Sequence, residues 1–322
     1  MPTIAETDFP ARPTQVGGNA LPDGVMMRAG ANIAIAVRRP DGSIATRAYP
    51  QAVKPSRMLR IPLLRGVVAL RVAATTGRRA FMDAAELRMP QSETEEDRPL
   101  SVLEKLLIVV TAGVGLVLEW GILKLGPLFI AKALDPGKTA FVFIEGGIRI
   151  GGLILLLYIL SRVPRIKKLL FGYHGAEHKT IATYEADEPL DADHAVNHSR
   201  FHPRCGTSFL LLSGFVSIAV FGVVLLVTGV FSLIGLIITR ILFAPVVTAV
   251  TYEIQKFGAE RLDNPFVSWL TKPGLAAQRI TTAEPTHEQV EVAVESLRVA
   301  LEPALATVRD APLAAEPHPI AA

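Results

Sequence analysis

Residues 205–239 read CGTSFLLLSGFVSIAVFGVVLLVTGVFSLIGLIIT and contain no charged side chain. A helix that crosses the hydrocarbon core of a bilayer needs about 20 apolar residues, so this run is too long for one crossing. Thr228-Gly229 lies inside the run and is a turn signal. The run therefore predicts a helical hairpin with membrane spans at residues 207–227 and 231–251, the second of which includes Arg240 and Pro245.

Two further apolar segments precede this hairpin, at residues 103–130 and 139–160. Half of the 322 residues are hydrophobic and the mean hydropathy is +0.37, which is high for a soluble protein. We therefore expect an α-helical polytopic membrane protein with about four transmembrane helices. Its membrane domain would occupy residues 99–252 and contact the lipid bilayer.

The segment before the membrane domain, residues 16–98, predicts a small α+β region. Residues 32–38 and 44–49 alternate as strands do, and the turn signal Arg39-Pro40-Asp41-Gly42 separates them, which indicates a β-hairpin. Residues 61–87 place arginines among Val, Ala and Leu. This pattern is typical of an amphipathic helix at a membrane surface.

The other flanking segments are simpler. Residues 253–302 form a C-terminal segment that ends in an amphipathic helix at residues 286–302. Residues 1–15 and 303–322 have few apolar anchors or are rich in Ala and Pro, and we expect both to be disordered.

Lysine and arginine are unevenly distributed. Of the 33, 15 lie before Leu106, and the His-rich loop at residues 164–205 is also basic, whereas the uncharged hairpin has none before Arg240. The positive-inside rule then places both termini and this loop in the cytoplasm. A net charge of +3 is too small to indicate nucleic-acid binding, and the single Cys205 excludes an intrachain disulfide.

The sequence His174-Gly-Ala-Glu177-His178 matches the H-x-x-E-H signature of inverted zinc peptidases. On a helix, His178 lies about 40° from His174, and Glu177 lies about 60° to the other side of His174. Two imidazoles can then share one divalent metal, with zinc the favoured ion, while Glu177 acts as the general base. The alternative is that these histidines are solvated loop residues.

A third ligand is needed, and the residues leave several choices open. Glu253 lies at the end of the last span, and Glu185 returns to the face of His178 on a continuous helix. His194, His198 and His202 are each four residues apart, so one helix would align them, and His202 with Cys205 forms a half-site for zinc. A second interpretation, equally favoured, is that Cys205 is a small buried apolar residue. A third and less favoured one is that it is a nucleophile paired with a histidine.

Four charged residues lie at membrane depth: Glu119, Glu145, Arg149 and Arg240. Charges in a bilayer are costly and normally face the bundle interior in pairs. Glu145 and Arg149 are one helical turn apart and can pair, so we expect Arg240 to reach Glu119 or Glu145. A proton or ion pathway is the less favoured interpretation.

Several motifs lie in a fixed order along residues 17–300. They are Gly17-Gly18-x-Ala20, Gly24-Val-Met-Met-Arg28, Ile61-Pro62-Leu-Leu-Arg65-Gly66-Val, Tyr173-His-Gly-Ala-Glu-His-Lys179, Tyr184-Glu185, His202-Pro-Arg-Cys-Gly-Thr-Ser208 and Tyr252-Glu253. In these the chain resembles the YqhQ-like bacterial membrane proteins, described as predicted metal-dependent enzymes. It departs from the pattern at Asp23, where that family usually has glutamate.

The resemblance implies a metal at His174 and His178. The remaining motif positions that could serve it are Glu177, Glu185, His202, Cys205 and Glu253. His194 and His198 are not part of the pattern.

Two functions follow from these residues. The first is a metal-dependent hydrolase acting on a protein or on a lipid-linked ester. The second is a non-catalytic membrane scaffold or assembly factor in which the metal is structural. Three ligands with an open position would favour the enzyme, and a closed site of His174, His178, His202 and Cys205 would favour the scaffold.

Overall fold

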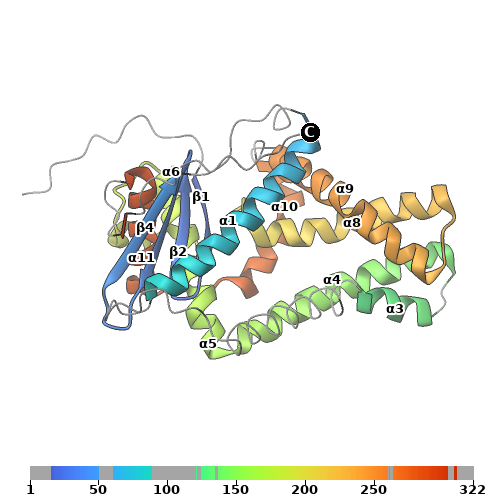
Figure 1. Ribbon diagram of the computed structural model, residues 1–322, viewed down its shortest axis with the longest axis horizontal. Coiled ribbons are helices and arrows are strands. Elements are labelled where there is room, and N and C mark those ends of the chain that lie inside the picture. Colours follow the sequence, from blue (N-terminus) through green and yellow to red (C-terminus); the bar gives the residue numbers. More distant parts are fainter. Residues whose placement is uncertain are drawn as a thin grey trace, which may run out of the picture.

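The computed structural model describes residues 16–50, 61–88, 121, 125–134, 137–259, 261, 264–303 and 308–309. A β-sheet covered by helices lies at one end, and long apolar helices extend from it (Figure 1). The predictions for residues 1–15, for most of 303–322 and for Glu119 lie outside the described residues.

The sheet is larger than the predicted hairpin. Its strands follow the order β1 to β5, antiparallel except for the β4–β5 pair: β1 Val16–Leu21, β2 Gly24–Ala29, β3 Asn32–Arg38, β4 Ile44–Pro50 and β5 Val308–Arg309. The β3–β4 hairpin is confirmed. Strands β1 and β2 were not predicted, because their glycines mask the alternation. Gly24 is needed where it pairs with Val37, since a Cβ there would collide with the carbonyl oxygen of Ala36.

Both faces of the sheet are covered, because residues one apart on a strand point to opposite sides. Ala34 and Ala36 pack against α6 (Gly172–Glu185) and α11 (His287–Leu301). Ile33 and Ile35 pack against the second half of α1 (Leu64–Arg88). This explains why β3 is apolar at every position from 33 to 37.

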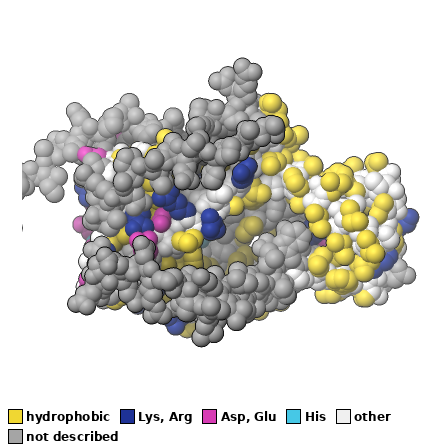
Figure 2. Space-filling model, viewed as in Figure 1, with side chains coloured by type: hydrophobic (Ala, Val, Ile, Leu, Met, Phe, Trp, Pro, Cys, Tyr) yellow, Lys and Arg dark blue, Asp and Glu magenta, His cyan; other side chains and the backbone are white. Residues whose placement is uncertain are grey.

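Three helices are long and apolar enough to cross a membrane: Lys138–Arg162 in α4, Gly206–Thr228 in α8 and Leu233–Gly258 in α9. They contain most of the spans predicted at 139–160, 207–227 and 231–251. The α8–α9 turn is at Gly229, whose positive φ of 64° suits glycine. Next to this turn, Leu226 and Val227 are 82% and 80% exposed, and hydrophobic side chains gather over this end of the molecule (Figure 2).

The first predicted span, 103–130, is described only at residue 121 and from residue 125 onwards, where α3 covers Gly126–Ala133.

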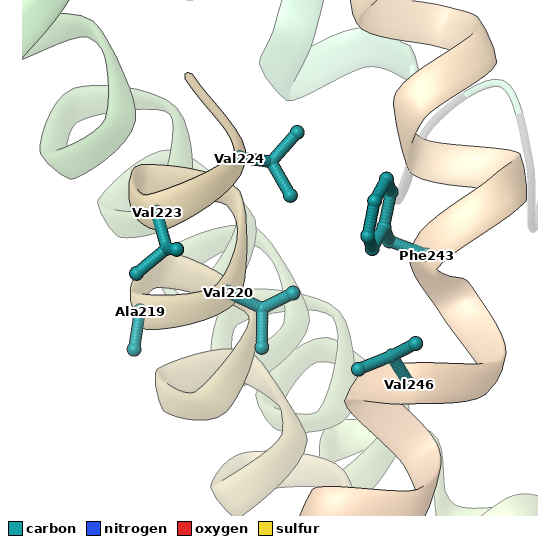
Figure 3. A pocket seen from close by; sticks show the side chains of 6 residues that line it. All are labelled: Ala219, Val220, Val223, Val224, Phe243 and Val246. Atoms are coloured by element: carbon teal, nitrogen blue, oxygen red, sulfur yellow. The ribbon is translucent and has the colours of Figure 1, made fainter. Parts of the chain in front are cut away.

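A crevice of about 330 Å³ between α8 and α9 has only apolar lining, including Val220 and Phe243 (Figure 3). Because its lining is apolar, this crevice has no side chain that could bind a metal or catalyse a reaction.

Glu145, Arg149 and Arg240, here called the membrane charge cluster, meet between the spans. Glu145 is 1% exposed, forms an ion pair with Arg149 and lies 3.1 Å from Arg240 Nη2. Arg149 also donates to Ser217 Oγ at 2.9 Å. Glu145, one of the two partners expected for Arg240, therefore lies beside it, while Glu119 is outside the described residues.

Helix α1 connects the two parts of the molecule. A Cβ on Gly66 would lie 2.9 Å from the Cα of Ala249, so the start of α1 packs directly on α9. Its last turns pack on the sheet through Ala84 and Leu87. The predicted helix is confirmed, and it runs from a membrane helix to the sheet.

The remaining helices of the described residues are α5 (Pro164–Ile166), η3 (Lys167–Phe171), α7 (Ala192–Ala195) and the longer α10 (Pro265–Thr281). Helix α10 returns from the end of α9 and packs beside α8.

Candidate metal centre

The H-x-x-E-H motif lies on α6, most of which is buried. Its glycines are explained by close packing. A Cβ on Gly175 would collide with the carbonyl oxygen of Ala283, and one on Gly172 would meet the amide group of Gln289. Glycine at these two positions therefore lets α6 approach its neighbours closely, which offsets its weak helix propensity.

Three ligand-type side chains, here called the metal cluster, converge beside α6. The Nε2, Nδ1 or Sγ atoms of His174, His178 and Cys205 lie within 4.8 Å of one another. His174 Nε2 is 3.2 Å from Cys205 Sγ, and the two imidazole centroids are 4.5 Å apart. Cys205 is buried and caps the start of α8.

The second nitrogen of each histidine in the metal cluster contacts a backbone carbonyl. His174 Nδ1 lies 2.8 Å from the oxygen of Thr281, and His178 Nδ1 lies 2.7 Å from the oxygen of Arg200. A carbonyl only accepts, so each Nδ1 carries the proton and each neutral ring keeps its lone pair on Nε2. Metal-binding histidines are held in this way, with the distal N–H donated to a fixed acceptor.

Electrostatics keep His178 neutral. Burial is the main factor that lowers its pKa from 6.5, and His174 also acts in this direction, while a hydrogen bond to Cys205 opposes the shift. A neutral imidazole is the form that binds metal.

His202 has a different role. Its Nδ1 accepts from the backbone N–H of Arg204 at 3.3 Å, so its proton is on Nε2, which faces Glu185 Oε2 at 3.3 Å. Both ring nitrogens therefore have partners. Glu185 also forms an ion pair with Arg204. Neither His202 nor Glu185 belongs to the metal cluster.

The structure places Glu253 in a different contact. Its carboxylate accepts from Arg65 Nε at 2.7 Å and from the backbone N–H of Leu63 at 3.1 Å. Glu253 thus ties the start of α1 to the end of α9. The described residues bring Cys205 to the two histidines instead.

Glu177 is 5% exposed and lies beneath strand β1. A Cβ on Gly18 would lie 3.0 Å from its Cγ, so glycine leaves room for this carboxyl. Burial is the main factor and raises the pKa of Glu177 to about 7, while protonation of His174 or His202 would act to lower it. The side chain can therefore both accept and donate a proton near neutral pH.

A cavity of about 550 Å³, here called the interfacial cavity, opens beside the metal cluster. Glu177, His178, His202 and Cys205 line one part of it. Two of the three residues of the metal cluster, together with Glu177, therefore adjoin a space large enough for a small molecule.

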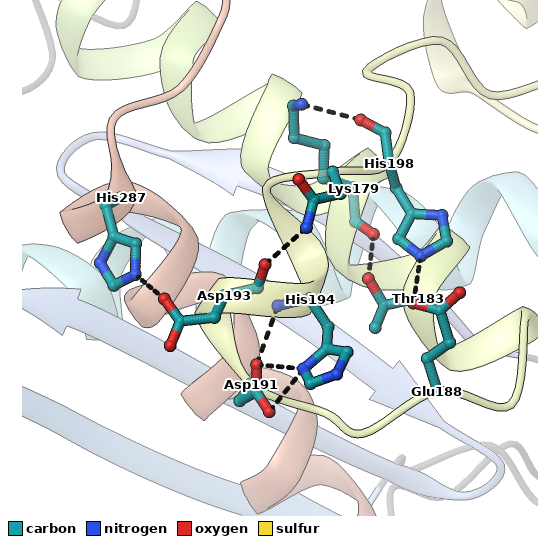
Figure 4. Close-up of polar contacts among 9 residues, drawn as sticks. Lys179, Thr183, Glu188, Asp191, Asp193, His194, His198 and His287 are labelled. Carbon is teal, nitrogen blue, oxygen red and sulfur yellow. Dashed lines mark hydrogen bonds and ion pairs between the residues drawn. The ribbon is translucent and has the colours of Figure 1, made fainter.

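The other two histidines of the loop bind carboxylates (Figure 4). His194 Nδ1 is 2.8 Å from Asp191, and His198 Nε2 is 2.9 Å from Glu188. Helix α7 ends at Ala195, so the single helix that would align residues 194, 198 and 202 does not form. Sequence spacing alone could not show this early end.

Some supporting groups could not be found from the sequence. The carbonyls of Thr281 and Arg200 carry no side-chain signal. Gln278 is fully buried, accepts from the backbone N–H of His202 at 2.8 Å and donates to its carbonyl at 2.7 Å. Among these supporting groups, only Gly18 could be singled out from the sequence, because it belongs to the Gly17-Gly18-x-Ala20 motif of the family resemblance.

Comparison with known proteins gives two matches. The model of a family described as "Protein of unknown function (DUF1385)" matches residues 61–303. "Uncharacterized protein YqhQ" of Bacillus subtilis (strain 168) is 34% identical over 295 residues, which are 88% of this chain and 91% of that protein. No solved structure matches the chain.

Proposed function

The chain belongs to the DUF1385 family and is similar to YqhQ, and we propose that it is a metal-dependent hydrolase at a membrane surface. The observation that carries the proposal is the convergence of two Nε2 lone pairs and one sulfur at the metal cluster. The single thiol S–H of Cys205 can donate to only one of the two Nε2 atoms, so the set has a lone pair in excess and is suited to a cation.

The donor set fits zinc best. Histidine nitrogen and cysteine sulfur are ligands that Zn²⁺ prefers, whereas Mg²⁺ and Ca²⁺ prefer oxygen. His174, His178 and Cys205 would hold the ion. Three protein ligands with a further open position are typical of catalytic zinc, which activates water or polarises a substrate oxygen when bound.

The chain itself would manage the proton. Hydrolysis adds the oxygen of water to the carbonyl carbon of an ester or amide, breaks the bond to the leaving oxygen or nitrogen, and moves one proton from water to that leaving group. Glu177 is suited to carry this proton, because its pKa of about 7 lets it accept and release a proton at the same pH. It is buried and lines the interfacial cavity, so it can meet a substrate there.

A structural metal in a scaffold is the second candidate. One observation favours it: the ligands come from α6 and from the start of α8, so a metal would tie the sheet region to the membrane helices. This role requires no function of Glu177. The two candidates therefore differ at that residue.

The experiment measures zinc content together with rescue of a strain that lacks the gene. His174→Ala, His178→Ala and Cys205→Ser should lose zinc, while His198→Ala, which alters a histidine outside the metal cluster, should keep both zinc and function. Glu177→Gln should keep zinc and lose about 10²- to 10⁴-fold of activity, because an amide cannot accept the proton. A Glu177→Gln protein that binds zinc and rescues fully would contradict the hydrolase.

We also place the spans in a bacterial inner membrane with the sheet and both termini in the cytoplasm. The arginine-rich segment before the spans and the basic loop support this orientation. A cysteine at Asp191, in a Cys205→Ser background, should resist membrane-impermeant thiol reagents in intact cells. Ready labelling would contradict it.

A further inference from the structure

The interfacial cavity has two chemically different parts. Helix α1 supplies a wall of small or apolar residues that includes Gly66, Ala69, Leu70 and Ala73. The opposite part contains the metal-cluster residues His178 and Cys205 with Glu177. A molecule that fills the cavity would therefore need an apolar portion and a polar portion.

The polar part of the cavity is also basic. Arg28, Arg204 and Lys256 line it, and Glu177 is the one acidic side chain among its lining residues, all of which are described. Arg204 also forms an ion pair with Glu185, Lys256 has a further interaction within the chain, and Arg28 is an exposed residue of β2. Basic side chains still outnumber acidic ones among the lining residues, which favours an anionic group.

The cavity lies at the ends of the membrane helices. Gly206 is the first residue of α8, and Tyr252 and Gln255 are in the last two turns of the span in α9; all three line the cavity. Leu63, just before α1, and Leu64 and Val67 in its first turn are exposed. If α8 and α9 cross the bilayer, the cavity lies at the level where lipid headgroups meet their chains.

We propose that the interfacial cavity binds an anionic phospholipid and that this lipid class is the substrate of the metal centre. The acyl portion would lie along the α1 wall, and the phosphate would lie among Arg28, Arg204 and Lys256, next to the metal cluster. The substrate assignment rests on the proposed hydrolase function, whereas lipid binding does not. A peptide is disfavoured, because the cavity is an apolar wall joined to a cationic end at membrane depth.

The test uses native mass spectrometry of the purified full-length protein, with zinc content measured on the same samples. The probes are dihexanoyl phosphatidylglycerol, dihexanoyl phosphatidylcholine and glycerol phosphate. Ala73→Trp places a bulky ring in the cavity, and Ala74→Trp, on the neighbouring exposed position that does not line it, is the matched control. Arg28→Gln removes one charge at an exposed strand position, which keeps the test informative if Ala73→Trp fails to fold.

Phosphatidylglycerol should bind about tenfold more tightly than phosphatidylcholine, and Ala73→Trp should weaken it about tenfold while Ala74→Trp leaves it unchanged. Arg28→Gln should weaken both phosphatidylglycerol and glycerol phosphate. Equal binding of the two lipids, or equal effects of the two tryptophans, would overturn the proposal. Binding of glycerol phosphate as tight as that of phosphatidylglycerol would also overturn it, in favour of a soluble phosphate compound.

Zinc content separates this inference from the proposed function. A protein that holds zinc but fails the lipid tests would refute the lipid inference and leave the metal centre standing. A wild-type protein that passes the lipid tests but never retains zinc would refute the hydrolase. His174→Ala should lose zinc and still bind phosphatidylglycerol within about twofold of wild type, since the cationic end remains.

Discussion

The metal cluster and the membrane charge cluster are both buried groups of ionisable side chains, but their chemistry is opposite. In the metal cluster, His174 and His178 donate their protons to backbone carbonyls and direct bare lone pairs toward Cys205. In the membrane charge cluster, Glu145 lies between two arginines, and Ser217 accepts from one of them. The first group has acceptors left over, and the second pairs its charges internally.

This difference distinguishes a binding site from a structural contact. Surplus lone pairs held in place are suited to binding a cation. In the membrane charge cluster the one carboxylate pairs with both guanidinium groups, and the ring of Phe221, 4.7 Å from the Arg240 guanidinium, accommodates part of the remaining positive charge. The membrane charge cluster therefore favours packing over an ion pathway.

The largest effect is expected from Glu145→Ala, which tests whether the membrane charge cluster is structural. Removing the carboxylate leaves two arginines unpaired at membrane depth, and loss of one partner from a buried pair costs about 3–5 kcal/mol. Thermal unfolding in detergent should show this loss, while the folded fraction keeps its zinc. The double variant Glu145→Ala/Arg240→Ala should be less destabilised than the sum of the two single variants.

Absence of coupling in this cycle would show that Arg240 does not depend on Glu145. A Glu145→Ala protein that is stable but has lost function would instead favour an ion pathway. The membrane charge cluster would then be functional, as proposed for the metal cluster, rather than structural.

An intermediate effect is expected from Gln278→Ala, which tests whether the metal cluster depends on its supporting shell. Gln278 holds the backbone of His202 from both sides and donates to Ser208 Oγ at 3.3 Å, so it fixes the segment that carries Cys205. Zinc affinity, measured by competition with a chelator, should fall about 10-fold. Arg279→Ala, on an exposed position of the same helix, is the control. Unchanged affinity in Gln278→Ala would mean that Cys205 is held by other contacts.

The smallest effect is expected at the surface, where His287 on α11 contacts Asp193 on α7 at 2.9 Å (Figure 4). The hydrogen bond to Asp193 is the main factor that raises the pKa of His287 above 6.5. Because the folded-state pKa is the higher one, this contact stabilises the fold fully below about pH 6.5 and is lost as the pH rises through the raised value. Solvent screens the pair, so the effect is local.

Hydrogen exchange of α7, corrected for the intrinsic pH dependence, should show greater protection at pH 6 than at pH 8 in the wild type. His287→Gln should remove most of this difference. The same pH dependence in the variant would assign it to another group, with the His194–Asp191 pair as the next candidate.

The sequence by itself determined the membrane helices, the turn at Gly229, the β3–β4 hairpin and the H-x-x-E-H pair. Each of these depends on a local pattern: an uncharged run long enough for a bilayer, a glycine that tolerates a positive φ, or two histidines one helical turn apart. The family resemblance was also readable, because its motifs are contiguous. The glycines of β1 and β2 hid two strands, since their pairing is set by the partner strand rather than by alternation.

Only the tertiary structure decided which residue joins the two histidines. Cys205, Glu185, His202 and Glu253 were equivalent in sequence terms, because spacing cannot show which of several distant donors closes on a helix. The fold pairs Glu253 with Arg65, occupies both nitrogens of His202 and brings Cys205 to 3.2 Å from His174. It also sets the tautomers, through backbone carbonyls that no side-chain pattern encodes. A metal centre depends on where lone pairs meet in space, and that is fixed by long-range packing.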